Sequence, residues 1–203
     1  MESIDNLILT SLKKCGRGTV FTKDDYAHYS NPKRVQKALE QLVNQGHVVR
    51  VARGIYCYPK IDKVWGTGYL PASYDDIANA IAKKERAKIV PTGVHALNRL
   101  GLSEQLPMRF VYLTNGRTRS RELADGHTIH FVHTALRNLE FQNRTAMLVT
   151  FALKEIGQER LTEEQKTHVL GLLQKEDKHS IQHDLALMPE WQEALHREPQ
   201  FRL

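Results

Sequence analysis

Residues 30–59 place an amphipathic helix directly before a tight hairpin, and this pairing constrains the chain more than any other stretch. Apolar residues recur at helical spacing after Pro32, and Gly46 ends the run. The apolar set is Val35, Ala38, Leu39, Leu42 and Val43, and the opposite set is Lys33, Arg34, Lys37, Gln41 and Asn44. We therefore expect a helix whose back packs on a core and whose front presents cations and amides, the groups that contact DNA phosphates and base edges.

The residues after Gly46 predict a β-hairpin. Valines at positions 48, 49 and 51 favour one strand, the Arg53-Gly54 pair favours a turn, and residues 55–58 favour the return strand. A helix followed by a basic hairpin is typical of the second half of a winged helix-turn-helix. The predicted DNA-binding residues are Lys33, Arg34, Lys37 and Gln41 on the helix, with Arg50 and Arg53 at or near the hairpin tip. The alternative is a helix and hairpin with an ordinary solvated charged face.

The positive charge of the chain is concentrated in its first third. The 203 residues carry a formal net charge of +6. Residues 1–63 hold 11 Lys and Arg against 6 Asp and Glu, whereas the remainder holds 18 against 17. The first third is therefore suited to a polyanionic partner, and the rest of the chain shows no such bias.

The order of the predicted elements indicates an α+β protein with two domains. A helix over residues 3–15, a short second helix opened by Thr22, and the helix and hairpin described above make a winged helix-turn-helix domain over residues 1–63. Residues 64–72 contain glycine and proline without periodicity and are interpreted as a linker. Residues 73–203 are expected to form an α+β domain with a small sheet and C-terminal helices. Its predicted strands cover residues 88–90, 109–114 and 127–134, and its main predicted helices begin near residues 73, 92, 143 and 162.

No residue pattern in the chain predicts catalysis or a metal site. Spacing of three on a strand puts His127 and His133 on one face and His130 on the other, so the three cannot converge on one ion. His179 and His183 have helical spacing but no third ligand. Nucleophile, P-loop and dinucleotide-binding motifs do not occur in the sequence. We therefore expect no enzyme activity, no metal and no cofactor.

Residues 116–122, with the sequence GRTRSRE, are expected to form a basic loop after an Asn-Gly turn. Its arginines, Arg117, Arg119 and Arg121, are candidates to contact a phosphate, an RNA backbone or an acidic protein partner. The alternative is a solvated charged loop. This segment is the best candidate for a functional surface outside the first predicted domain.

Composition favours a cytoplasmic protein that does not cross a membrane. The two cysteines, Cys15 and Cys57, lack CxxC spacing and make no disulfide framework, which favours a reducing compartment. The first residues have no cationic segment before their apolar residues, unlike a signal peptide. No apolar run approaches the roughly 18 residues of a membrane span.

The chain resembles a known family through motifs in both predicted domains. The sequence RGIYCYP at the hairpin, followed by VPTGVHALNRLGL and FVYLTNG, is similar to the AbiEi-type antitoxins of bacterial type IV toxin–antitoxin systems. The most telling parts are residues 53–56 with Pro59, and residues 112–116. The resemblance implies an antitoxin that represses its own operon by binding inverted repeats in promoter DNA. It also implies neutralisation of a nucleotidyltransferase-like toxin by the C-terminal domain, and so a part in phage defence by abortive infection.

The physical size of a winged helix adds an expectation about the DNA complex. A single module covers only about 600–1,000 Å² of protein surface. Specific repression therefore needs two molecules on neighbouring half-sites, which we expect to form a dimer on DNA.

Three other functions stay open from the sequence. One is a winged helix transcriptional regulator whose C-terminal domain senses a small ligand. Another is an enzyme with a nuclease or phosphoryl-transfer site near the basic loop, which clustered titratable groups with perturbed pKa values would indicate. The last is a protein whose winged helix mediates protein contacts instead of DNA binding. A neighbouring toxin gene distinguishes the antitoxin from the regulator, and a band-shift with the chain's own upstream DNA distinguishes DNA binding from protein contact.

Overall fold

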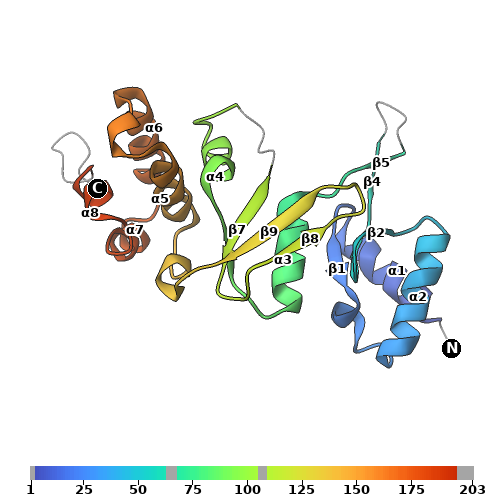
Figure 1. Cartoon of the computed structure of the whole chain (residues 1–203). Helices are drawn as coiled ribbons and strands as arrows, with labels where there is room; N and C mark the ends of the chain where they lie inside the picture. The colour runs from blue at the N-terminus through green and yellow to red at the C-terminus, as the bar shows by residue number, and fades with distance from the viewer. Residues whose placement is uncertain (1–2, 63–67, 105–108, 196–203) are drawn as a thin grey trace. The chain divides into compact units, whose positions relative to one another are not determined.

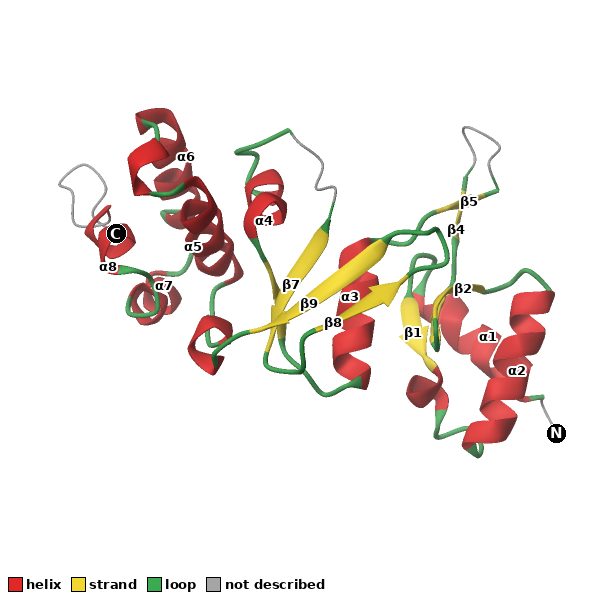
Figure 2. Cartoon of the chain, in the orientation of Figure 1, coloured by secondary structure: helices red, strands yellow, loops and turns green. Residues whose placement is uncertain are grey.

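The computed structural model describes residues 3–62, 68–104 and 109–195 and shows a mixed α+β protein (Figures 1 and 2). The predicted α+β class is therefore confirmed. Two compact units divide the chain. Unit 1 comprises Met1–Ala87 and Ser120–Ile129, and unit 2 comprises Lys88–Arg119 and His130–Leu203. This division differs from the predicted ranges, because residues 73–87 and 120–129 group with the N-terminal residues.

The first part of unit 1 contains two α-helices, a 3-10 helix and the strands of a three-stranded sheet. In chain order these are α1 (Ile4–Cys15), β1 (Val20–Thr22), the 3-10 helix η1 (Lys23–Tyr26), α2 (Pro32–Asn44), β2 (Val49–Ala52) and β3 (Ile55–Cys57). β3 lies in the middle of the sheet and pairs antiparallel with β1 on one side and β2 on the other. The predicted short second helix is the 3-10 segment, and Thr22 and Asp25 form the capping box that opens it.

α2 is fixed by a cap at its start and by its apolar face along its length. The side chain of Asn31 accepts a hydrogen bond from the backbone N–H of Arg34 at 3.0 Å, and Pro32 occupies the first turn. The apolar face packs into a core shared with α1 and the sheet. This core is Ile8, Leu12, Phe21, Tyr26, Val35, Ala38, Leu39, Leu42, Val48, Tyr56 and Tyr58. The predicted helix and hairpin are therefore confirmed as elements.

Short strands occupy the two ends of the stretch that contains the predicted linker. β4 is Lys60–Ile61 and β5 is Tyr69–Leu70, and the two pair antiparallel. The hydroxyl of Tyr69 donates to the carbonyl of Gly46 at 2.6 Å, which ties β5 to the end of α2. Tyr69 and Leu70 of the predicted linker thus belong to a local β-pair, and residues 64–67 of that prediction lie outside the described residues.

α3 (Tyr74–Lys84) packs against β1 and β3 within unit 1. Its buried residues are Ile77, Ala78, Ala80, Ile81 and Ala82. The sequence predicts this helix and its apolar face but assigns it to the second domain. That assignment is corrected by the packing, because periodicity shows which face of a helix is buried and not which surface covers it.

The first part of unit 2 contains two strands, with a helix between them in the chain. β6 (Ile89–Pro91) pairs antiparallel with β7 (Phe110–Thr114), and α4 (Gly93–Arg99) connects them. With β8 (Arg119–Glu122) and β9 (Thr128–His133), each of which contains some residues assigned to unit 1, the strand order of the sheet is β6-β7-β9-β8. Ile129 and Phe131 are fully buried and Val132 is exposed, as the alternation along β9 predicts. The sequence predicts a loop over residues 116–122. That prediction is corrected, because the last four of these residues form the strand β8.

The C-terminal part of unit 2 is helical, as predicted. Its segments are η2 (Leu136–Leu139), α5 (Arg144–Ile156), η3 (Gln158–Arg160), α6 (Glu163–Leu173), α7 (Lys178–Leu185) and α8 (Glu190–Leu195). α5 packs against α4, α6 and α7 (Figure 1). The buried carboxylate of Asp184 accepts the backbone N–H groups of Gln142 and Asn143 at 2.9 and 2.7 Å, so α7 holds the start of α5. Within the described residues, no helix is both long and apolar enough to span a bilayer.

Candidate nucleic-acid interface

The polar side chains of α2 lie on its solvent face. The side chains that the sequence predicts to contact DNA, Lys33, Arg34, Lys37 and Gln41, all belong to exposed residues. On the opposite face, Val35 and Leu39 have no exposed surface. The helix is therefore held by its apolar back and presents its cations to solvent.

No carboxylate in the described parts of the chain forms an ion pair with the cations of this face. Glu40 is an exposed acid on the same helix, and its carboxylate accepts a hydrogen bond from Nε2 of Gln36 at 2.9 Å. The same nitrogen lies 3.1 Å from the hydroxyl of Tyr56 and so links α2 to β3. Exposed cations on a helix that is fixed in this way are suited to replace the counterions of DNA phosphates.

The β2–β3 hairpin supplies two further cations. Arg50 lies in β2, opposite Tyr56 of β3, and Arg53 lies in the turn between the strands; both residues are exposed. Gly54 completes the turn with a φ of +75°, a conformation that glycine adopts without the steric cost of a side chain. The predicted turn at Arg53-Gly54 is therefore confirmed.

The turn of the hairpin also meets the end of α3. A Cβ atom placed on Gly54 would lie 2.7 Å from Nζ of Lys84, so this ammonium group lies directly beside the turn. Lys84 is exposed and adds a cation next to Arg53. Sequence reasoning missed Lys84, because no local pattern connects the last turn of a helix at residue 84 with a turn at residue 54.

The three arginines of the predicted basic loop have different environments. The guanidinium of Arg119 lies over the ring of Phe131, 4.4 Å from its centroid, and donates to the carbonyl of Arg117 at 2.9 Å. Arg121 forms an ion pair with Glu85 at 2.9 Å. Of the three, Arg117 is the exposed arginine whose side chain has no partner among the described residues. The structure thus gives the three side chains different surroundings.

Two of the histidines considered from the sequence, His127 and His133, have separate hydrogen-bond partners. The hydroxyl of Tyr74 donates to Asp125 at 2.9 Å and lies 3.1 Å from Nδ1 of His127. Burial and the carboxylate of Asp125 raise the pKa of Tyr74 to about 12, so the phenol stays protonated at neutral pH. Nδ1 of His133 lies 2.9 Å from the carbonyl oxygen of Gly116. Among the described residues, no three His, Cys, Asp or Glu side chains gather in an arrangement that could hold a metal ion.

The fold and the site define a mixed α+β protein whose N-terminal unit carries a cationic helix face followed by a basic hairpin. The chain belongs to DUF6088, a family of unknown function, whose model matches residues 7–181. Among solved structures, it is similar to the crystal structure of the RV2827C protein from Mycobacterium tuberculosis. That similarity has 16% sequence identity and a TM-score of 0.47, and it covers 96% of this chain and 81% of that chain. No curated protein matches the chain.

Proposed function

We propose that unit 1 binds double-stranded DNA as a winged helix-turn-helix domain. The order of its elements supports this proposal, with η1 and α2 as the two helices of the motif and the β2–β3 hairpin as the wing. The observation that carries the proposal is the face of Lys33, Arg34 and Lys37, exposed and unpaired among the described residues, on a helix whose opposite face is buried.

In this proposal α2 enters the major groove, which is wide enough to admit a helix. An arginine on the helix can read guanine through two hydrogen bonds, and a glutamine can read adenine, which gives Arg34 and Gln41 candidate roles in sequence reading. Arg50 and Arg53 contact the sugar-phosphate backbone or the adjacent minor groove from the wing. Lys84 adds a phosphate contact beside the wing turn.

The proposed target is an inverted repeat in promoter DNA. A single winged helix covers only about 600–1,000 Å² of surface, so specific repression requires two copies on neighbouring half-sites. The complex then shares its two-fold symmetry with the operator.

The second part of the proposal is that the chain is the antitoxin of a type IV toxin–antitoxin system. Its support is the resemblance carried by residues 53–59, 90–102 and 110–116. Unit 1 represses the operon, and unit 2 neutralises a nucleotidyltransferase-like toxin. We place Arg117 on the surface that acts on the toxin, because it is exposed and its guanidinium has no partner among the described residues.

DNA binding is tested by fluorescence anisotropy with a duplex from upstream of the chain's own gene. We expect the wild-type protein to bind it more tightly than a shuffled duplex. The triple variant Lys33→Ala, Arg34→Ala and Lys37→Ala should lose at least tenfold in affinity. A control with the same change of charge in unit 2, Arg144→Ala, Lys175→Ala and Lys178→Ala, should bind like the wild type. Equal losses in the two triple variants would count against α2 as the DNA-binding face.

Antitoxin function is tested by co-expressing the chain with the adjacent gene and measuring growth and promoter activity. The wild-type chain should restore growth and silence the promoter. The α2 triple variant should restore growth without silencing the promoter, and Arg117→Glu should silence the promoter with weaker rescue. Absence of rescue by the wild-type chain would refute the antitoxin role and leave the DNA-binding proposal to stand on its own test.

A further inference from the structure

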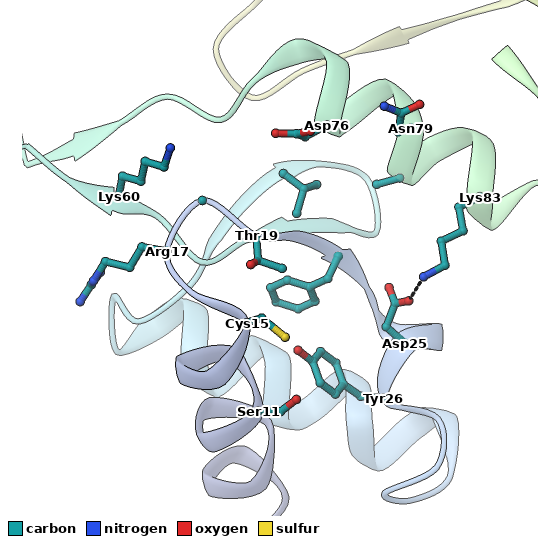
Figure 3. A pocket seen from close by; sticks show the side chains of 14 residues that line it. Ser11, Cys15, Arg17, Thr19, Asp25, Tyr26, Lys60, Asp76, Asn79 and Lys83 are labelled. Carbon is teal, nitrogen blue, oxygen red and sulfur yellow. Dashed lines mark hydrogen bonds and ion pairs between the residues drawn. The ribbon is translucent and has the colours of Figure 1, made fainter. Parts of the chain in front are cut away.

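A pocket of about 630 Å³ opens within unit 1, between α1, β1, η1, β4 and α3 (Figure 3). Its volume lies in the range of small-molecule sites, roughly 300–1,000 Å³. The side chains that give the pocket its chemistry are Arg17, Phe21, Tyr26, Lys60, Asp76 and Asn79. None of them belongs to the face of α2 or to the wing, so the pocket is distinct from the proposed DNA interface.

One side of the pocket is cationic. The stem of Lys60 lies across Gly18, where an added Cβ would fall 2.6 Å from its Cε atom. This packing holds the Lys60 ammonium at the pocket edge, and the described residues offer it no hydrogen bond or ion pair. Arg17 lies on the same side (Figure 3), but its guanidinium is already engaged. It donates to the carbonyl of Pro59 at 2.9 Å and lies over the ring of Tyr58, 4.8 Å from its centroid.

The wall formed by α3 carries an acid and an amide. Asp76 and Asn79 are three residues apart on the helix, so their side chains lie on one face (Figure 3). Neither side chain has a hydrogen bond or an ion pair among the described residues. The third polar residue of this wall, Lys83, is neutralised by Asp25, whose carboxylate lies 2.6 Å from the ammonium group. Lys60 on one side and Asp76 on the other are therefore the charged side chains of the pocket that have no hydrogen bond, ion pair or ring contact among the described residues, whereas Arg17 is held by Pro59 and Tyr58.

The base of the pocket is aromatic and buried. Phe21 and Tyr26 meet edge to face, with ring centroids 5.4 Å apart, and both are almost fully covered. Burial raises the pKa of Tyr26 to about 12, so its hydroxyl remains protonated. These two rings offer apolar surface with a hydroxyl group at its side.

We propose that this pocket binds a small zwitterion that carries an ammonium group and a carboxylate, of the chemical class of the α-amino acids. The ammonium group donates to Asp76 and Asn79, and the carboxylate accepts from Lys60. A simple anion would leave Asp76 facing a like charge, and a simple cation would do the same for Lys60. A singly charged carboxylate fits better than a phosphate, because Lys60 is the one cation of the lining without a partner among the described residues, while the guanidinium of Arg17 is held in place by Pro59 and Tyr58. The remaining volume accommodates a side chain over Phe21 and Tyr26.

The pocket lies in unit 1, whereas the sequence placed a ligand-sensing role in the second predicted domain. Four of its lining residues, Asp76, Asn79, Ala80 and Lys83, come from α3. The sequence assigns this helix to the second predicted domain, whereas the structure places it in unit 1. The proposal does not depend on DNA binding, and its test uses the protein without DNA.

The full-length protein is titrated with each of the twenty standard L-amino acids by isothermal titration calorimetry. We expect at least one to bind saturably with one site per chain. Asp76→Asn and Lys60→Gln should each weaken that binding at least tenfold. The control variants Asp177→Asn and Lys175→Gln, which make the same changes of charge in unit 2, should leave it unchanged. Circular dichroism and thermal unfolding verify that each variant folds, which is expected because Asp76 and Lys60 are exposed.

A second arm uses the 2-hydroxy acid with the same carbon skeleton as the tightest amino acid. The hydroxy acid lacks the ammonium group, so its affinity should be at least tenfold lower. Equal affinity would show that the pocket takes a plain anion and would overturn the proposal. Absence of saturable binding for all twenty amino acids at 10 mM, or unchanged binding in both pocket variants, would overturn it as well.

Discussion

Arg34 combines a capped backbone with an exposed side chain. Its backbone N–H is held by the side chain of Asn31 at 3.0 Å, while its guanidinium faces solvent. Arg34→Ala should therefore leave the stability of the helix nearly unchanged. If Arg34 reads a base, the substitution should cost about 1–3 kcal/mol of DNA-binding free energy and relax specificity at one operator position. Asn31→Ala is the matched comparison, because it should lower the free energy of unfolding by about 1 kcal/mol through loss of the cap.

These outcomes are separated by measuring binding to a set of singly substituted operators and thermal unfolding for both variants. A uniform loss of affinity across all operators in Arg34→Ala would assign this arginine to a phosphate and not to a base. A stability loss in Arg34→Ala as large as that in Asn31→Ala would show that the side chain serves the fold.

The ion pair between Asp25 and Lys83 predicts a pH-dependent stability difference. Burial opposes ionisation of Asp25, but hydrogen bonds from Lys83 and Thr22 outweigh it and hold the pKa of the carboxyl below its ordinary value of 3.8. A carboxyl with a lowered pKa in the folded state adds stability above its unfolded pKa, and this stability is lost as pH falls through the folded pKa. Lys83→Gln should therefore be less stable than the wild type at neutral pH, and the difference should vanish in acid.

The size of this effect is bounded by exposure. The side chain of Lys83 is 74% exposed, so solvent screens the pair and the loss should be at most about 1 kcal/mol. Urea unfolding of both proteins at pH 7, 5 and 3 measures it. A difference of the same size at all three pH values would show that the ionised state of Asp25 is not its cause.

At the scale of elements, the wing turn and α6 give opposite predictions for the same substitution. Gly54 has a φ of +75°, and an added Cβ would also meet Nζ of Lys84. Gly54→Ala should therefore lower the free energy of unfolding by about 1–2 kcal/mol. Gly171 lies within α6, and an added Cβ there meets nothing within 4 Å. Gly171→Ala should raise the free energy of unfolding by about 0.5–1 kcal/mol, because alanine favours the helix. Chemical unfolding of both variants checks the signs, and a neutral Gly54→Ala would show that the turn changes conformation.

Periodicity explains which elements were predictable. Val35 and Leu39 mark the buried face of α2, and Ile129 with Phe131 marks that of β9, because each pattern repeats at the period of its own element. β8 was not predictable, since residues 119–122 read RSRE and show no apolar alternation. Its strand conformation comes from backbone pairing with β9, which the side chains of β8 do not encode.

The candidate interface and the pocket also contain parts that could be predicted from the sequence and parts that could not. The face of α2 and the turn at Arg53 follow from local sequence, and the structure shows these side chains exposed. Lys84 and the pocket wall on α3 depend on contacts between separate segments of the chain. Such contacts follow from tertiary packing. The spacing of residue types along a single sequence predicts local elements and does not predict which distant segments meet.

At the scale of the whole molecule, the charge distribution and the modest size of one DNA-binding module predict a two-to-one complex. Analytical ultracentrifugation with a duplex that holds the complete inverted repeat should give two chains per duplex. A duplex with one half-site should bind one chain, and more weakly, because the smaller interface gives fewer phosphate contacts. One chain per complete repeat, at the same affinity as a half-site, would contradict symmetric binding.

The salt dependence of DNA affinity is the measurement that addresses the role of the α2 face most directly. The logarithm of the binding constant falls linearly with the logarithm of salt concentration, with a slope of about −0.9 for each phosphate neutralised. The wild-type protein should show a steep negative slope with its own upstream duplex, and Arg53→Ala should flatten the slope by about one unit. The Lys33→Ala, Arg34→Ala and Lys37→Ala variant should flatten it by about two to three units. A slope in this variant equal to that of the wild type would show that the α2 face does not meet the phosphates of DNA.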